Sequence, residues 1–280
     1  MAALRRRQWS LTKICNPRHK QTDVNTSHHD LLLIGGDNAT TWIVYNRLVR
    51  EFGIFPCIIE EHLPRSTLLK NRARKLGWLP VLDQLAFVAL LRPLLRYQAA
   101  RRVREICRDN DLETRAPLTP AIARVDNIND PAAIARIKAF TPKIVIVNGT
   151  RILRPDVLKA VPAIFINTHQ GITPQYRGSH GAYWALHKSD KENCGVTVHL
   201  VDQGIDTGNI IGQAMIEPTS ADGFVTYPYL QTAAALPILS KAVSEARQGE
   251  LATRAISGPS AVWYHPGVTQ YLRAWLRGVR

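Results

Sequence analysis

Short apolar runs alternate with helical patterns along the chain from Asp30 onward. Residues 31–34 form an apolar run that ends in Gly35 and Gly36, which is typical of a buried parallel strand and its turn. A helical pattern with apolar positions between Trp42 and Val49 follows, and residues 54–60 are predicted to form a second strand. This order is that of a βαβ unit, which predicts a parallel sheet.

The same alternation continues in the second half of the chain. Helical patterns cover 131–140, 181–187 and 222–248, and apolar runs predict strands at 143–148, 163–169, 195–201 and 209–216. The predicted fold class is therefore α/β, with a doubly wound, mainly parallel sheet and a C-terminal helix followed by an aromatic-rich tail.

Residues 62–108 interrupt this alternation. The part 70–108 lacks strand alternation and is predicted to form one or two helices inserted between strands. Its wholly apolar stretch, 85–91, is bracketed by Asp83 and Arg92. That stretch is far shorter than the roughly 20 apolar residues that a membrane-spanning helix needs, so no span is predicted.

Composition agrees with a folded protein. Hydrophobic residues make up 45% and charged residues 21% of the 280 residues, which excludes disordered and low-complexity classes. Four scattered cysteines without a CxxC pair indicate reduced thiols and a cytoplasmic protein, and no metal site is expected.

The net charge of +14 is concentrated in two segments. Residues 1–20 carry a net +6 and residues 63–108 a net +9, so the rest of the chain is close to neutral. Residues 1–29 lack the apolar region of a secretory signal and are expected to form a basic, flexible tail rather than a transit peptide. The insertion is expected to be a helical hairpin packed on the body or on a second subunit. The alternative is a peripheral contact with an anionic membrane surface.

Candidate chemistry lies at the end of the predicted strand 163–169. Asn167 and His169 are two residues apart, so their side chains share one face, at the carboxyl end where open α/β sheets bind ligands. An amide donor beside an imidazole suits acyl transfer, because the amide stabilises an oxyanion while the imidazole exchanges protons. A carboxylate such as Asp206 could hold the imidazole in its charged form or take up a proton through water.

Several motifs occur in a fixed order around this pair. They are Asn148-Gly149-Thr150-Arg151-Ile152-Leu153, Asn167-x-His169, Pro174-Gln175-Tyr176-Arg177-Gly178, the strand Gly195-Val196-Thr197-Val198-His199, and Asp206-Thr207-Gly208. In this order they resemble the folate-dependent formyltransferases, which include glycinamide ribonucleotide, methionyl-tRNA and sugar N-formyltransferases. The resemblance is strong over 140–218 and weak over 30–60.

The resemblance implies a Rossmann-like formyltransferase domain over 30–218, with the basic insertion 63–108 inside it and residues 219–280 forming the C-terminal helix and tail. It implies transfer of a formyl group from 10-formyltetrahydrofolate to a primary amine, without a metal. Asn167, His169 and Asp206 would be catalytic. The implied folate-binding residues are Arg151, Ile152, Leu153, Val201, Asp202, Gly204 and Ile205.

Further positions have two interpretations each. Gly35, Gly36, Asp37 and Asn38 form either an anion cradle for substrate or a plain strand-to-helix turn. Tyr176, Arg177 and His180 are candidate acceptor-binding residues. His199 is either a packed strand residue or a neighbour of the site, and core packing is favoured for Tyr183 and Trp184.

The expected acceptor is a small amine, carried on a phosphorylated molecule such as an amino sugar nucleotide. Nucleic acid is not favoured, because the charge lies outside the motif region and only 72 residues follow Gly208. The alternatives are an enzyme like glycinamide ribonucleotide formyltransferase, one like methionyl-tRNA formyltransferase, a formyltetrahydrofolate hydrolase, and a non-catalytic folate-binding module. The expected location is the cytoplasm, with the membrane surface as an alternative site; the oligomeric state is left open.

Overall fold

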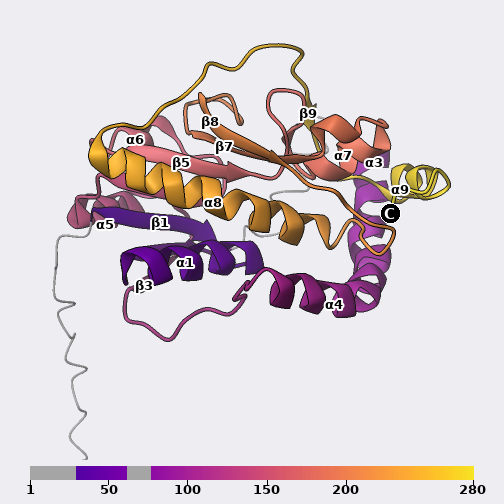
Figure 1. Cartoon of the computed structure of the whole chain (residues 1–280), viewed down its shortest axis with the longest axis horizontal. Helices are drawn as coiled ribbons and strands as arrows, with labels where there is room; N and C mark the ends of the chain where they lie inside the picture. Colours follow the sequence, from indigo (N-terminus) through magenta and orange to yellow (C-terminus); the bar gives the residue numbers. More distant parts are fainter. Residues whose placement is uncertain (1–29, 62–76) are drawn as a thin grey trace, which may run out of the picture.

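The computed structural model describes residues 30–61 and 77–280. The predicted basic tail 1–29 and the first part of the insertion, up to residue 76, lie outside the described residues. A seven-stranded sheet organises the rest, in the order β3-β2-β1-β4-β5-β7-β8 (Figure 1). Its strands are β1 (Leu31–Gly36), β2 (Cys57–Glu60), β3 (Ile122–Val125), β4 (Ile144–Asn148), β5 (Ile164–His169), β7 (Gly195–Leu200) and β8 (Ile210–Met215).

The sheet is mainly parallel, as predicted. Strands β1 to β5 pair in parallel, whereas β7 is antiparallel to β5 and to β8. All residues of β1, β2 and β4 are buried. Strands covered on both faces need apolar residues on both, which explains why their sequences are continuous apolar runs.

Helices cover both faces of the sheet. One core cluster joins the sheet to α1 (Ala39–Phe52) and α8 (Tyr227–Gln248), and α8 lies along the sheet in Figure 1. A second cluster joins the opposite face to α5 (Pro131–Phe140) and α6 (Pro155–Leu158). This two-sided layering is the doubly wound arrangement predicted from the sequence.

A third, aromatic cluster lies at one end of the molecule. It joins α7 (Gly181–His187), α9 (Val268–Trp275) and the insertion through rings that include Phe87, Tyr183, Phe224 and Tyr271. The centroid of the Phe87 ring is 5.1 Å from that of Phe224 and 5.4 Å from that of Tyr271. The C-terminal tail and the insertion are therefore packed together on the body.

The described part of the insertion is one continuous helix rather than a hairpin. It consists of α3 (Trp78–Ala86), a π-helical turn (Phe87–Leu91) and α4 (Arg92–Asp109). Arg102 anchors it to the body through two bonds to the buried Asp222 carboxylate, of 2.9 and 3.1 Å. By length and composition alone, Trp78–Asp109 is long and apolar enough to cross a membrane, which the expectation based on 85–91 did not anticipate. That expectation counted only the uninterrupted apolar run and omitted the apolar residues beyond Asp83 and Arg92.

Other differences concern element ends and short elements. Strand β2 begins at Cys57 rather than at Ile54, whose side chain is exposed. Helix α8 begins at Tyr227, because the Asp222 side chain instead accepts hydrogen bonds from Thr219. Strand β3, helix α6, the short helical turn Lys191–Asn193 and the pair β6 (Arg177–Gly178) and β9 (Val262–Trp263) were not predicted. They are too short or too polar to give a periodic signal.

Candidate active site

Strand β5 delivers two polar side chains to the carboxyl end of the parallel part of the sheet. Asn167 and His169 lie on one face of the strand, with Thr168 between them on the other. The antiparallel pairing with β7 puts His199 directly opposite Asn167. The Asn167 Nδ2 atom is 3.1 Å from His199 Nε2, so the sheet register itself brings the third polar side chain to the site.

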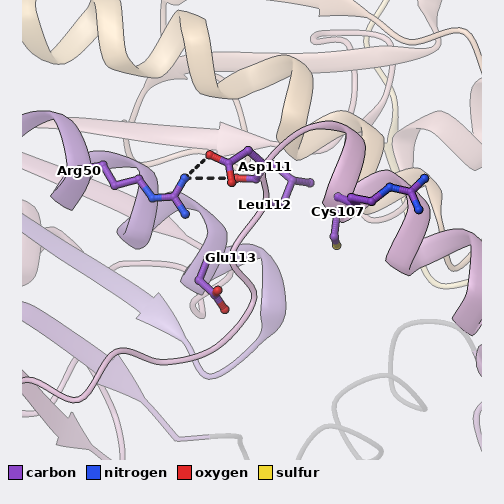
Figure 2. A pocket seen from close by; sticks show the side chains of 6 residues that line it. Arg50, Cys107, Asp111, Leu112 and Glu113 are labelled. Carbon is purple, nitrogen blue, oxygen red and sulfur yellow. Dashed lines mark hydrogen bonds and ion pairs between the residues drawn. The ribbon is translucent and has the colours of Figure 1, made fainter.

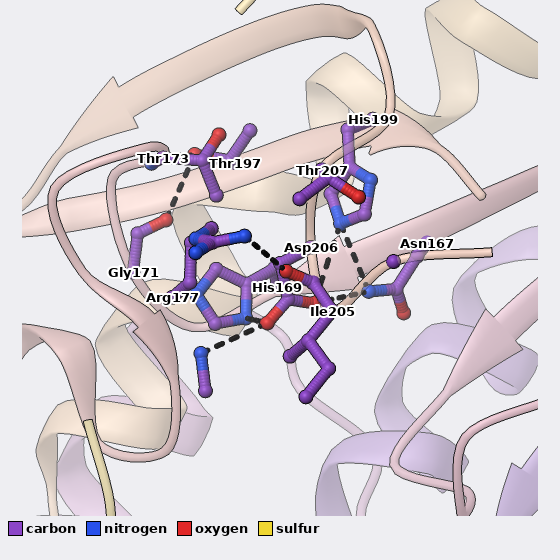
Figure 3. A network of polar contacts seen from close by, with 12 residues as sticks. Asn167, His169, Gly171, Thr173, Arg177, Thr197, His199, Ile205, Asp206 and Thr207 are labelled. Carbon is purple, nitrogen blue, oxygen red and sulfur yellow. Dashed lines mark hydrogen bonds and ion pairs between the residues drawn. The ribbon is translucent and has the colours of Figure 1, made fainter. Parts of the chain in front are cut away.

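Asp206 joins them from the loop between β7 and β8. Figure 3 shows its carboxylate between the two imidazoles: Oδ2 is 3.3 Å from His169 Nδ1, and Oδ1 is 3.6 Å from His199 Nε2. The Asn167 Nδ2 atom is 3.5 Å from the same Oδ1. The structure therefore brings together the three residues singled out in the sequence, and adds His199 to them.

The segment that contains β6 fixes both His169 and Asp206 through its backbone. The Tyr176 carbonyl oxygen is 2.7 Å from His169 Nε2, and the Gly178 N–H donates to Asp206 Oδ2 at 2.9 Å. The Arg177 guanidinium donates to the Ile205 carbonyl at 3.1 Å, one residue before the carboxylate. Asp206 itself has a φ of 51°, in the left-handed region that non-glycine residues seldom adopt. These contacts hold an otherwise unfavourable loop conformation.

The C-terminal tail supports this segment from behind. β9 pairs with β6, and the Trp263 Nε1–H donates to the Gln175 carbonyl at 2.9 Å. The Trp263 ring stacks on that of Tyr176, with the centroids 5.8 Å apart. A Cβ on Gly178 would lie 2.3 Å from the Trp263 carbonyl oxygen, so the approach of the two chains requires glycine.

Burial favours the neutral form of His169, whereas the neighbouring groups favour the ionised form of Asp206. His169 is 5% exposed, and this burial lowers its pKa, although the Asp206 carboxylate and the Tyr176 carbonyl act in the opposite direction. Burial alone would raise the pKa of Asp206, but the two histidines and the Gly178 N–H outweigh it and lower that pKa to about 2. At neutral pH the carboxylate is ionised, and His169 can gain or lose a proton beside it.

Hydrogen bonding orients the Asn167 amide. The His199 Nδ1 atom is 2.7 Å from the Leu200 carbonyl oxygen, so this nitrogen carries the proton, and Nε2 accepts from the Asn167 amide. The second amide N–H of Asn167 points toward Asp206 at 3.5 Å, the long limit of a hydrogen bond. One N–H group is therefore held firmly, and the other is available to an incoming oxygen.

The loop after β4 is fixed by a buried carboxylate. The Glu60 side chain accepts from the Arg151 backbone N–H at 2.9 Å, forms an ion pair with the Arg151 guanidinium and accepts from Ile128 N–H at 2.8 Å. Of the predicted folate-lining residues here, Ile152 is 60% exposed, whereas Leu153 is buried in the core on one face of the sheet. The Arg151 side chain is committed to Glu60 and the Asp126 carbonyl, and its backbone N–H and carbonyl are bonded to Glu60 and to the Thr150 hydroxyl, so of these three residues Ile152 offers exposed surface to a ligand.

The loop after β7 carries the remaining predicted folate residues. Val201 packs against the core, and its N–H donates to the Phe165 carbonyl at 2.9 Å. The Asp202 side chain closes the loop by accepting from Gly204 N–H at 3.0 Å and from the Thr207 hydroxyl at 2.7 Å. Ile205, next to Asp206, is 39% exposed.

The turn after β1 is used structurally. The Asn38 side chain accepts from Thr41 N–H at 3.1 Å and caps α1. The Asp37 carboxylate accepts from Trp42 Nε1–H at 2.9 Å and from the Arg124 guanidinium at 2.8 Å. A Cβ on Gly36 would lie 2.5 Å from the Gly149 carbonyl, and one on Gly35 would lie 2.4 Å from the Thr41 side chain. Residues 35–38 were interpreted either as an anion cradle or as a plain strand-to-helix turn, and these contacts are those of the turn.

The predicted acceptor residues divide between the site and the core. Arg177 lies at the site, but the buried Tyr176 side chain turns away and its hydroxyl donates to Asp190 at 2.8 Å. His180 packs its ring 4.4 Å from that of Phe224. Tyr183 and Trp184 are buried in the aromatic cluster, as favoured from the sequence. The backbone groups of Tyr176 and Gly178, and the supporting Trp263, gave no sequence signal, because their roles depend on long-range pairing.

Two cavities lie away from the polar cluster. One, of about 290 Å³, is bounded by the end of α1, the end of α4 and the residues that follow it, where Arg50 forms an ion pair with Asp111 (Figure 2). The other, of about 700 Å³, lies between α3, α7, β9 and α9. Neither is lined by the Asn167, His169 and Asp206 side chains. Within 30–61 and 77–280, no group of three or more His, Cys, Asp or Glu side chains is arranged to hold a metal ion.

Sequence comparison finds relatives over the part that carries this site. Residues 96–227 match the family model described as Formyl transferase. The chain is 35% identical over 92 residues to a methionyl-tRNA formyltransferase of Chlorobium chlorochromatii, which covers 33% of this chain and 29% of that protein. It is 34% identical over 96 residues to the corresponding enzyme of Pelotomaculum thermopropionicum, which covers 34% and 30%. The matched part thus spans less than a third of these relatives.

Structural comparison extends the similarity over most of the chain. A sugar N-formyltransferase from a Shewanella species matches with a TM-score of 0.55 and 14% identity, covering 89% of this chain and 87% of that one. Glycinamide ribonucleotide transformylase 1 of Symbiobacterium toebii matches with a TM-score of 0.51 and 19% identity, covering 82% and 96%. The chain therefore shares its fold with these formyltransferases, and the part that matches the family model includes Asn167, His169 and Asp206.

Proposed function

We propose that the protein transfers a formyl group from 10-formyltetrahydrofolate to a primary amine. The observation that carries this proposal is the convergence of Asn167 and His169, from β5, on Asp206 of a separate loop, at 3.5 and 3.3 Å from its carboxylate. The family match over 96–227 supports it, because it covers all three residues.

The three side chains have complementary roles in such a transfer. The amine nitrogen bonds to the formyl carbon, the bond from that carbon to N10 of the folate breaks, and a proton passes from the amine to N10. The available Asn167 N–H stabilises the negative charge that develops on the formyl oxygen. His169 takes up and returns the proton, and Asp206 stabilises the imidazolium form while this happens.

The loops beside the cluster suit a flat, partly apolar donor. Ile152 after β4 and Ile205 after β7 are both exposed, and each belongs to a loop held in place by a carboxylate, Glu60 for the first and Asp202 for the second. Such a surface fits the ring system of a folate, with backbone groups of 201–205 beside it for its polar edge. When bound there, 10-formyltetrahydrofolate would supply the activated formyl group.

For the acceptor, we favour an amine on a phosphorylated small molecule, such as a nucleotide-linked amino sugar. The structural relatives that match most of this chain and most of their own length include sugar N-formyltransferases, whereas the methionyl-tRNA formyltransferases match over a third of it. An N-formyltransferase from Helicobacter canadensis of the same fold is described in complex with folinic acid and dTDP-3-aminofucose.

The test is release of tetrahydrofolate by the full chain from 10-formyltetrahydrofolate, with mass spectrometry of the acceptor. The panel contains nucleotide-linked amino sugars, glycinamide ribonucleotide, methionyl-tRNA and a no-amine control. Release only with an amino sugar, with formation of its formamide, is the expected result. Release without amine would indicate a hydrolase. No release with any acceptor, from folded protein that binds folate, would contradict the proposed activity.

A further inference from the structure

The helix Trp78–Asp109 exposes apolar side chains along the side that faces away from the body. Trp78, Leu79 and Leu82 are 63%, 81% and 55% exposed, and the same stripe continues with Leu90 at 75% and Tyr97 at 83%. Leu79 and Leu82 are three residues apart and Leu90 and Tyr97 are seven apart, spacings that return to the same side of a helix. Leu85 and Leu94 belong to the same stripe. A surface helix ordinarily places polar residues on this side.

The opposite side of the helix is apolar as well. Val81 and Phe87 are buried, and Phe87 packs in the aromatic cluster, 5.4 Å from the ring centroid of Tyr271. The buried Gln84 donates to the His265 carbonyl at 2.8 Å. The apolar part of the helix is Trp78–Leu91, and a helix that is apolar on both sides belongs either in a core or in contact with lipid. Here the body covers only one of the two sides.

Helix α9 enlarges the exposed surface. It lies beside α3 (Figure 1). The Asp83 carboxylate accepts from the Thr269 hydroxyl at 2.5 Å. Leu272, Trp275 and Leu276 of this segment are 47%, 53% and 77% exposed. The outer apolar face therefore consists of Trp78, Leu79, Leu82, Leu85, Leu90, Leu94, Tyr97, Leu272, Trp275 and Leu276.

Positive charge surrounds this face. Arg96 is exposed between Leu94 and Tyr97, Arg101 and Arg104 are exposed farther along α4, and Arg273 and Arg277 are exposed at α9. The acidic side chains of the helix are engaged: Asp83 with Thr269, Glu105 with Arg101 and Arg102, and Asp109 with Arg108. The net charge around the outer apolar face is thus strongly positive.

We infer that the outer apolar face docks, in the plane of the interface, on a membrane that contains anionic lipids. Exposed leucines supply apolar area, tryptophan and tyrosine suit the headgroup region, and the surrounding arginines attract acidic headgroups. These are two independent signals, which stable peripheral binding requires. The helix lies on the membrane rather than crossing it, because its other side is packed in the aromatic cluster and Arg102 is held by Asp222.

A second copy of the chain fits this face less well. A two-fold interface brings the same surface of both subunits together, so the arginines around each face would meet those of the other. The acidic side chains that could offset them are engaged within the helix or with α9. An anionic lipid surface supplies the missing charge. This inference does not depend on the proposed enzymatic function.

Flotation of the full-length protein with vesicles tests this inference. The probes are large unilamellar vesicles of phosphatidylcholine alone and of phosphatidylcholine with 30% phosphatidylglycerol, at low and high salt. We expect flotation with the anionic vesicles, with weaker binding at high salt because exposed charges are screened. No lipid-dependent shift of the folded protein would overturn the inference.

Matched variants assign the binding to the outer apolar face. Leu90→Asp with Leu94→Asp should weaken binding by roughly tenfold or more per leucine, and Arg96→Gln with Arg104→Gln by about fivefold per arginine. Leu118→Asp and Arg136→Gln, at exposed positions outside this face, should leave it unchanged. Leu90→Ser with Leu94→Ser is the milder pair if the aspartates impair folding, judged by circular dichroism.

The oligomeric state without lipid distinguishes docking on a membrane from docking on a second copy of the chain. Light scattering should give the same mass for the wild type and for the Leu90 and Leu94 variants. A wild-type dimer that these variants dissociate would overturn the inference and assign the face to a second copy. Equal loss of flotation in the control variants would also overturn it.

Discussion

At the carboxyl end of β5, Asn167, His169, His199 and Asp206 are largely removed from water, and each contacts another of the four. Along the outer apolar face the reverse holds: leucines, tryptophans and a tyrosine stand exposed, and the charged groups surround them. Buried polar side chains require hydrogen-bonding partners, so these four residues hold one another in a fixed arrangement. The same burial and contacts shift the pKa of Asp206 and of His169. Exposed apolar side chains, in contrast, form a surface that is stabilised by contact with another molecule. The comparison separates a site built for chemistry from a surface built for attachment, and variants of one should leave the other intact.

The largest effect is expected from His169→Ala. The imidazole is the group that can exchange a proton at the site, so turnover should fall by about 10⁴, the upper end for general acid–base catalysis. The measurement is single-turnover transfer to the amine that the acceptor panel selects. Folate binding and vesicle flotation should stay close to wild type. Near-normal turnover would remove His169 from the mechanism.

Asn167→Ala should lower kcat by roughly 10²–10³ if its amide stabilises the developing oxyanion, as for other single donors. The loss should appear in kcat and in kcat/KM alike. A change in KM alone would assign Asn167 to substrate binding. The Leu90 and Leu94 aspartate variants are the matched control, since they should retain kcat while losing lipid binding.

Asp206 gives a pH dependence with a definite sign. Its pKa falls from 3.8 to about 2 on folding, so the native carboxylate contributes stability above pH 4, about 2 kcal/mol, that is lost as the pH falls toward 2. The free energy of unfolding, measured by urea denaturation, should be lower in Asp206→Asn than in the wild type at pH 7. The difference should shrink by pH 3, and a difference that grows on acidification would contradict the contacts of Asp206 described here.

The smallest of these effects is expected from Trp263→Ala. This positioning residue touches the Gln175 carbonyl and the Tyr176 ring, behind the backbone that fixes His169 and Asp206. We expect a loss of about tenfold in kcat and a shifted pH–rate profile, because the carbonyl partner of His169 moves. Trp263→Phe, which keeps the stack, should recover most of the rate. Trp275→Ala, on the outer apolar face, should leave kcat unchanged, and an equal loss there would indicate general destabilisation.

Much of the fold follows from local pattern, and part of the site does as well. The runs at 31–34 and 143–148 predict strands because both faces of a parallel sheet are covered. Asn167 and His169 share a face because the side-chain period of a strand is two. In contrast, the place of Leu153 in the core, the inward turn of Tyr176 and the ring packing of His180 depend on contacts with distant segments. No periodicity in the sequence reports such contacts.

The sequence by itself determined the alternating α/β order, the position of Asn167 and His169 at a strand end, and the concentration of positive charge in the insertion. The tertiary structure decided that His199 and Asp206 meet Asn167 and His169, that the backbone of Tyr176 and Gly178 fixes them, and that the insertion helix is covered on only one side. The reason is the range of the interactions. Hydrophobic period and local spacing are properties of neighbouring residues, whereas burial, pKa and exposure are set by segments that meet only when the chain folds.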